Sequence, residues 1–394
     1  MSKINRWLLP EGVEEILPNL AWSIHNYQQS VLELFSGWGY DLVIPPLLEY
    51  TDSLLLDHSS DIDLQTFKLV DQLSGRSMGI RADITPQTCR IDAHSLKQDG
   101  VTRLCYAGSV LHSVPKSQLA SRTPIEVGAE LFGDDSINSD FESISLMIAS
   151  LELANVPSSE IHLDLGHVGI YRGLLNQAQL SAEQEQDLLD AFDRKAGLEV
   201  AAILAEANIV SELAAMIQAL VSLNGGAEIL DKALEVLASA PHEVLSAVHM
   251  LKDIASAVSL HSPETPLFFD LAELRGFAYH TGLVFAAYID GVGHSVANGG
   301  RFDNLGQAFG RGRPATGFNI NVKALMSLSK SEDSASVILA PAISSLSDPS
   351  LKEFIRQLRA QGERVVFSLD ADQAINAQRH IVSDSGQWLI KPIS

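Results

Sequence analysis

Arg275 is the side chain whose surroundings most strongly suggest chemistry. It lies in LRGFAYHTGLVF, residues 274–285, close to Tyr279 and His280. Burying a guanidinium is costly unless it meets a carboxylate or a phosphate. This stretch alone leaves two explanations open: Arg275 binds an anionic group of a ligand, or it forms a structural ion pair with an Asp or Glu.

Acidic, hydroxyl and basic side chains also gather in two earlier stretches. GIRADITPQTCR carries Asp83 and Thr85, and CYAGSVLHSVPKSQLASRTPIEVGAELFG carries Arg122, Glu126 and Glu130. Each carboxylate taken singly could equally be a surface or ion-pair residue. The chain contains no GxxxxGK(S/T), HExxH, GxSxG or CxxC motif, and His58, His94 and His112 lack metal-ligand spacing. We therefore expect neither a metal nor a cofactor.

The charge of the chain argues against nucleic acid as a partner. Its 394 residues carry a net charge of -22 and the pI is about 4.8, whereas nucleic-acid affinity comes largely from Lys and Arg. The two cysteines have no CxxC spacing, which favours a reducing compartment. The first residues lack the apolar core of a secretory signal, and no uncharged stretch is long enough for a membrane helix. We expect a cytoplasmic protein without a membrane partner.

The elements that must position these residues form four regions. Residues 1–174 mix helical patterns with short strands. One strand lies in YDLVIPPLLEY and ends at Pro45 and Pro46, which cannot donate to a sheet ladder; the others are RSMGIRAD, TRLCYAGSVLHSV, PIEVGAELFG and EIHLDLGHV. Residues 175–261 repeat Leu and Ala at helical spacing, which predicts an all-helical insertion whose acidic surface would repel RNA. Strands resume in 262–330. Residues 331–394 alternate strand and helix, with DQAINAQRHIVSD as a helix, and predict a small α/β domain.

The ordered motifs resemble the catalytic core of histidyl-tRNA synthetase, a class II aminoacyl-tRNA synthetase. The most specific are Arg-Gly-x-x-Tyr-x-Thr-Gly, from Arg275, and the later Gly-Gly-Arg-Phe-Asp, residues 299–303. The resemblance implies an α+β fold: a class II synthetase-like antiparallel sheet core flanked by helices, interrupted by the helical insertion and followed by the small α/β domain.

Two departures from the synthetase pattern affect the nucleotide half of the site. His112 stands where the resemblance places the arginine that binds the ATP α-phosphate, and Asn321-Val322-Lys323-Ala324 replaces Gly-x-Glu-Arg. Loss of one such cation typically costs about 3 kcal/mol of transition-state stabilisation. Arg122 or Lys323 could in principle take over. The C-terminal region, residues 331–394, is smaller than the anticodon-binding domain of the synthetase and has no excess of basic residues.

The amino-acid half of the synthetase pattern is better preserved. The resemblance implies that a free histidine is bound by Asp83, Thr85, Arg122, Glu126, Glu130, Arg275, Tyr279 and His280. Arg275 would face the ligand's carboxylate or help to close the loop over it. Glu126 replaces the usual glutamine, and the added negative charge suits an ammonium better than a triphosphate.

This combination is similar to the regulatory subunits of ATP phosphoribosyltransferase, synthetase-like proteins without synthetase activity. The resemblance implies a dimer within a hetero-oligomer, with residues 40–50 contributing to self-association. The partner would be the short-form catalytic subunit, which the chain would activate in the first step of histidine biosynthesis and inhibit when L-histidine binds. Two alternatives remain. One is a divergent histidyl-tRNA ligase or ATP-dependent amino-acid ligase; the other is a structural partner with a vestigial pocket.

Overall fold

The computed structural model describes residues 7–55, 60–115, 120–272, 280–328, 337–342, 347–368 and 377–393. The chain divides into two compact units, residues 1–329 and 330–394. Within the described residues, no helix is long and apolar enough to cross a membrane.

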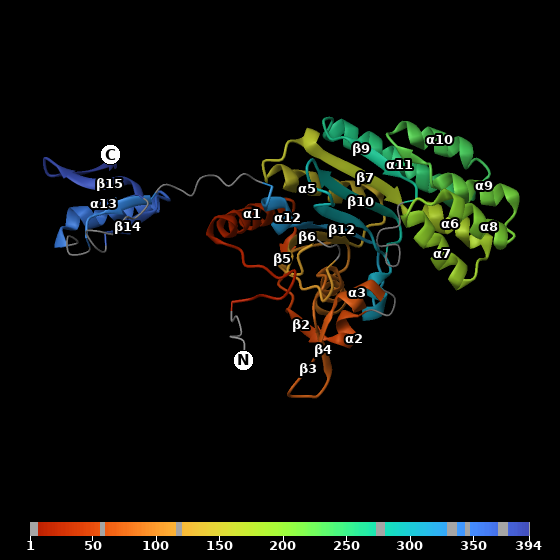
Figure 1. Ribbon diagram of the computed structural model, residues 1–394, viewed down its shortest axis with the longest axis horizontal. Coiled ribbons are helices and arrows are strands. Elements are labelled where there is room, and N and C mark those ends of the chain that lie inside the picture. The colour runs from red at the N-terminus through yellow and green to blue at the C-terminus, as the bar shows by residue number, and fades with distance from the viewer. Residues whose placement is uncertain are drawn as a thin grey trace. The chain divides into compact units, whose positions relative to one another are not determined.

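The first unit contains most of the helices and strands (Figure 1). Its helices are α1 (Pro18–Gly37), α2 (Thr51–Leu54), α3 (Ser60–Gln65), α4 (Thr85–Arg90), α5 (Ile137–Glu152), α6 (Val168–Ala178), α7 (Ala182–Asp193), α8 (Gly197–Glu206), α9 (Ser211–Leu220), α10 (Glu228–Val236), α11 (His242–His261) and α12 (Val322–Met326). A π-helical turn follows α4 at Ile91–Leu96, and 3-10 turns occupy Ser158–Glu160 and Leu305–Phe309. Its strands are β1 (Asp41–Leu42), β2 (Leu48–Tyr50), β3 (Phe67–Val70), β4 (Ser77–Ile80), β5 (Thr102–Ser109), β6 (Ile125–Phe132), β7 (Ile161–His167), β8 (Asn224–Gly225), β9 (Leu267–Asp270), β10 (Leu283–Ile289), β11 (Ala297–Arg301) and β12 (Ala315–Asn321).

A nine-stranded sheet organises the first unit, in the order β1-β5-β6-β12-β11-β10-β7-β9-β8. Its pairings are antiparallel except β1 with β5 and β7 with β9. The neighbouring strands β6 and β12, third and fourth in this order, come from distant parts of the sequence. The predicted α+β architecture, an antiparallel sheet flanked by helices, is confirmed.

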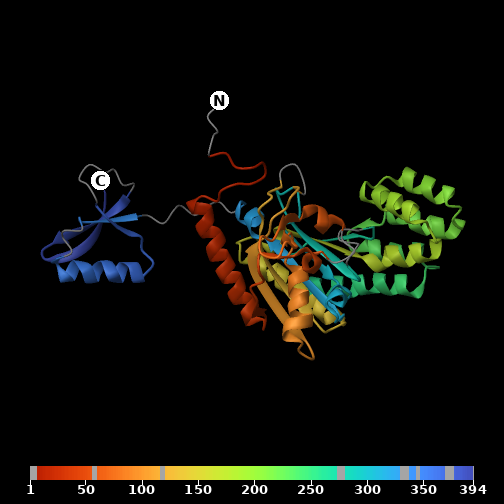
Figure 2. The same cartoon turned by 90° about the horizontal axis from the view of Figure 1, so that it is seen from below.

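Helices cover one face of this sheet. In α1 the buried residues Ile24, Tyr27, Val31 and Phe35 recur every three or four positions and form one apolar stripe. The ring of Phe35 packs edge-on against Phe318 of β12, with centroids 5.9 Å apart. Figure 2 shows α1 running along the sheet. The opposite face is therefore the one left for polar side chains.

Helices α7 to α11 gather beyond the β7–β9 side of the sheet (Figure 1). The first of them starts at a capping box, in which Ser181 and Gln184 each accept a backbone N–H from the other. The two-residue strand β8 lies within this otherwise helical region and pairs with β9.

The stretch YDLVIPPLLEY forms two strands instead of the one expected. β1 joins the large sheet, whereas β2 belongs to a three-stranded sheet of order β2-β4-β3. Pro45 and Pro46 lie between them and cannot donate to a ladder, so the chain changes sheets there.

The second unit has its own core and a four-stranded sheet of order β14-β13-β15-β16. Its elements are β13 (Val337–Ala340), α13 (Pro349–Ala360), β14 (Val365–Phe367), β15 (Ala377–Asp384) and β16 (Gln387–Pro392). The prediction of a helix in DQAINAQRHIVSD is wrong for its described part, since residues 377–384 form β15. Pairing with β13 on one side and β16 on the other overrides the weak helical preference of Ala, Gln and Arg here.

Candidate functional site

On its polar face, the large sheet has two paired glycines on the neighbouring strands β11 and β12. Glu130 of β6 pairs with Gly317 of β12, and Gly317 pairs with Gly300 of β11. Directly paired residues point to the same face, so these positions form one row across three strands. A Cβ on Gly317 would collide with Glu130 Oε2, and a Cβ on Gly300 would lie 2.8 Å from the His280 ring. Glycine at both positions therefore makes a floor on which Glu130 and His280 rest.

Glu130 lies at one end of this floor and is almost completely buried, at 1% exposure. Its Oε1 accepts hydrogen bonds from Thr85 Oγ1 at 3.0 Å and from Tyr106 Oη at 3.2 Å. Burial raises the pKa of the Glu130 carboxyl well above its ordinary value; the nearby Asp83 and Glu126 act in the same direction, and the two hydrogen bonds oppose them. A cation entering the site would favour the ionised form of Glu130.

The start of α4 brings two more predicted site residues to Glu130. Asp83 Oδ1 accepts the backbone N–H of Thr85 at 2.9 Å, and Pro86 follows at the first turn of the helix. This turn holds the Thr85 hydroxyl against Glu130. The structure therefore brings together Asp83, Thr85 and Glu130 from distant parts of the sequence.

Glu126 lies four residues before Glu130 on the same strand and so on the same face, at 7% exposure. The buried Arg81 lies beside it, because the guanidinium packs on Gly108, the partner of Glu126 in the ladder. Burial lowers the pKa of Arg81, and the Glu126 carboxylate opposes that effect. Arg81 also donates to the carbonyls of Ser109 and Pro45, so it is a fixed part of the wall.

The arrangement can receive a small ligand that carries positive charge. Three carboxylates, Asp83, Glu126 and Glu130, interact electrostatically in a largely buried environment. An ammonium or a ring N–H would offset their charge, whereas a triphosphate would be repelled. Among the described residues, no group of three or more His, Cys, Asp or Glu could hold a metal ion.

Comparison with known proteins matches the whole chain. Residues 12–325 match the model of the histidyl-tRNA synthetase family, and residues 335–391 match that of the ATP phosphoribosyltransferase subunit HisZ C-terminal domain. The chain is 50% identical over 403 residues to the ATP phosphoribosyltransferase regulatory subunit of Pseudomonas syringae pv. syringae and 51% identical over 401 residues to that of Stutzerimonas stutzeri, with both chains covered completely each time. The chain belongs to the ATP phosphoribosyltransferase regulatory subunit family.

Solved structures agree with this regulatory-subunit family and with its synthetase-like fold. A Bacillus halodurans protein described as an ATP phosphoribosyltransferase regulatory subunit/histidyl-tRNA synthetase superposes with a TM-score of 0.81 at 27% identity, covering 95% of this chain and 96% of that one. The histidyl-tRNA synthetase of Nostoc sp. PCC 7120 has a TM-score of 0.79 at 18% identity, covering 99% and 97%, and supports the fold alone. The nine-stranded sheet is thus the class II synthetase-like core expected from the sequence.

In this member of the regulatory-subunit family, the two cations that could replace the synthetase arginines are held by other groups. Lys323 Nζ lies 2.7 Å from Glu14 Oε1 and 3.1 Å from Ser121 Oγ. Arg122 donates to the carbonyls of His112 and Glu11. Both side chains therefore tie the segment around residues 11–14 to the core.

His112, which the resemblance aligns with a phosphate-binding arginine, makes a structural contact. The ring is buried at 2% exposure, and its Nε2 donates to the Ala82 carbonyl at 3.0 Å. An imidazole in this position does not offer the planar fork of donors that an arginine supplies.

Four of the other predicted site residues lie next to Glu130 or to its glycine floor: Asp83, Thr85, Glu126 and His280. Arg275 and Tyr279 lie outside the described residues. Arg122 packs against the Phe67 ring, 5.2 Å from its centroid, and points its donors to backbone carbonyls. The sequence reasoning missed Tyr106. It lies two residues after Leu104, so the two side chains share a face of β5, and Leu104 pairs with Glu130 on the neighbouring strand.

Proposed function

We propose that the chain activates a short-form ATP phosphoribosyltransferase catalytic subunit and transmits feedback inhibition when L-histidine binds in the pocket around Glu130. The observation that carries the proposal is the match of residues 335–391 to the C-terminal domain of the regulatory subunit, in a chain whose core matches a synthetase. The relatives' names supply the partner enzyme. The pocket supplies the effector site.

The chemistry of the pocket supports histidine as the effector. Its carboxylates suit the α-ammonium and a ring N–H, and the buried hydroxyls of Thr85 and Tyr106 fix the Glu130 carboxylate that would meet them. Arg275 would face the ligand's carboxylate. An analogue without ring nitrogens would leave buried partners unsatisfied and should bind far more weakly.

The proposal includes the absence of catalysis in this chain. The cations Arg122 and Lys323 are engaged by the chain's own groups, and His112 occupies the motif position of the phosphate-binding arginine. We further propose a dimer within a hetero-oligomer in the cytoplasm, where the two free, buried cysteines would stay reduced.

The deciding experiment co-purifies the full chain with the short catalytic subunit and measures ATP phosphoribosyltransferase activity with and without histidine. Arg275→Ala and Glu130→Ala should weaken inhibition, and Glu183→Ala on the exposed surface of α7 is the matched control. Coupling between two sites is reciprocal, so histidine binding should shift the equilibrium between the active and inhibited states of the complex by about 1–3 kcal/mol.

Two further outcomes separate the alternatives. Histidine-dependent exchange of pyrophosphate into ATP by the purified chain would favour a ligase and refute the proposal. A melting temperature that histidine leaves unchanged would favour a structural partner with a vestigial pocket, because bound ligand stabilises the folded state by mass action.

A further inference from the structure

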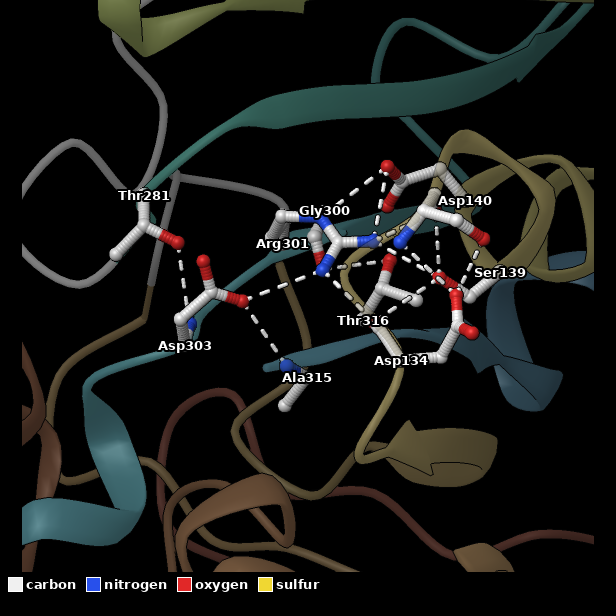
Figure 3. Close-up of polar contacts among 10 residues, drawn as sticks. Asp134, Ser139, Asp140, Thr281, Gly300, Arg301, Asp303, Ala315 and Thr316 are labelled. Atoms are coloured by element: carbon white, nitrogen blue, oxygen red, sulfur yellow. Dashed lines mark hydrogen bonds and ion pairs between the residues drawn. The ribbon is translucent and has the colours of Figure 1, made fainter. Parts of the chain in front are cut away.

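Arg301 follows Gly300 in β11, and hydrogen-bond acceptors surround its guanidinium. Its side chain is 6% exposed, and its Nη2 lies 3.0 Å from the fully buried Asp140 Oδ2 of α5. Nη1 donates to Asp303 Oδ1 at 3.3 Å and to the Asp134 carbonyl at 3.1 Å, and Nη2 also donates to Ser139 Oγ at 2.9 Å. Figure 3 shows the guanidinium between the two aspartates, with every branch of the fork in use.

The same residue holds the backbone that enters β10. Thr281 N donates to the Arg301 carbonyl at 2.7 Å, and Asp303 N donates to Thr281 Oγ1 at 3.1 Å. A Cβ on Gly282 would lie 3.1 Å from Arg301 Cδ, so the aliphatic stem of the arginine lies directly against this glycine. Residues 281 and 282 are thus fixed through both the main chain and the side chain of Arg301.

His280 directly precedes this anchored pair. Both terminal nitrogens of Arg172 on α6 donate to the His280 carbonyl at 3.3 Å. His280 is 8% exposed as a residue, and its imidazole lies over Gly300, the residue before Arg301. Because Gly300, Gly317 and Glu130 are paired in one row, the His280 ring and the Glu130 carboxylate share one face of the sheet.

We propose that Arg301, clamped by Asp140 and Asp303, is a positioning residue that holds the His280 ring over Gly300 and thereby sets how tightly the pocket binds histidine. This inference rests on the proposed function. A buried arginine–aspartate pair is weak evidence for stability, because well-packed apolar residues often do as well. The evidence for a positioning role is that Arg301 contacts Thr281 and Gly282, the two residues that follow His280.

Arg301→Lys tests the proposal in the complex of the full chain with the catalytic subunit. Lysine keeps the charge but loses the planar fork that spans Asp140 and Asp303. The histidine concentration for half-maximal inhibition should rise about tenfold, and calorimetry on the full chain should show the same loss of histidine affinity. Arg103→Lys is the matched control, because Arg103 forms a bidentate pair with Glu142 on the same helix α5 and makes no contact with residues 280–282 that the structure records.

A second variant and a double-mutant cycle separate positioning from general damage. Thr281→Val removes only the acceptor of the Asp303 N–H and should shift histidine affinity in the same direction; it decides the question if Arg301→Lys does not fold. His280→Asn alone should weaken binding, and adding Arg301→Lys to it should weaken binding no further, because residues that act as a unit are not additive.

The outcomes distinguish the two proposals. If histidine does not inhibit the wild-type complex, the proposed function is wrong. If it does, and Arg301→Lys or Thr281→Val behaves like Arg103→Lys, or the effects of Arg301→Lys and His280→Asn multiply, then Arg301 does not act through His280 and the positioning role is overturned.

Discussion

Gly317→Ala would disturb the glycine floor beneath Glu130 without adding or removing a charged group. The new Cβ would overlap Glu130 Oε2 and lie 2.5 Å from the Ala129 carbonyl, which is backbone and cannot move aside. Glu130 must therefore rotate away from the Thr85 and Tyr106 hydroxyls. Overpacking a core typically costs about 1–3 kcal/mol, and each of the two lost hydrogen bonds adds about 1 kcal/mol, so the free energy of unfolding should fall by about 3–5 kcal/mol.

The same change should weaken histidine binding at least about tenfold, because the carboxylate that receives the ligand is displaced. Urea denaturation measures the stability, and calorimetry with histidine measures the affinity. Gly293→Ala is the control: nothing lies within 4 Å of a Cβ there, so both quantities should stay near wild type. Wild-type histidine affinity in Gly317→Ala would refute the reasoning that places the ligand against Glu130.

Three further changes test the electrostatics of the first unit. Glu130→Gln should make the ligand-free protein more stable than wild type at pH 8. Burial raises the pKa of Glu130, so the wild type loses stability as pH rises above about 4.3. Urea denaturation should show that the difference in the free energy of unfolding between the two proteins becomes smaller towards pH 4. His167 accepts the Gly169 N–H at Nδ1, and burial, followed by the charge of Arg301, lowers its pKa to about 4. As pH falls, His167 is protonated in the unfolded chain before it is protonated in the folded protein. The free energy of unfolding should therefore fall by at most about 3 kcal/mol between about pH 6.5 and about pH 4. His167→Asn can still cap α6 and should make the free energy of unfolding less dependent on pH in the same assay. Asp140→Asn leaves the buried Arg301 without its carboxylate and should cost about 3–5 kcal/mol in chemical denaturation, and a loss below about 1 kcal/mol would contradict the buried ion pair.

The sequence predicted the elements of the large sheet better than the contacts between them. Short runs rich in apolar residues located β5, β6 and β7, and most residues of these strands are buried. Pro45 and Pro46 marked the end of the first strand in YDLVIPPLLEY, but the second strand there, β2, and the strand β15 were missed, because each depends on pairing with strands elsewhere in the chain.

The candidate site shows the same limit. Ordered motifs named Thr85 and Glu130, which the structure brings to 3.0 Å, although nothing in either stretch reveals that distance. The partner of Arg301 could not be foreseen, because Asp140 lies 161 residues earlier in the chain in an ordinary amphipathic helix. Glycine at position 317 carried a signal that was not used: a small residue inside a strand often marks a close approach by another group.

The strand order of the large sheet has a consequence for how the protein is made. Glu130 leaves the ribosome early, but the strand that lies beside it, β12, ends at Asn321, close to the end of the first unit. Until β12 has been synthesised, one edge of β6 has no partner strand, and Glu130, which is buried in the folded protein, is exposed to water. Long-range pairing of this kind slows folding and exposes unpaired edges to aggregation. The nascent chain should therefore depend on chaperones until its last core strand has been synthesised.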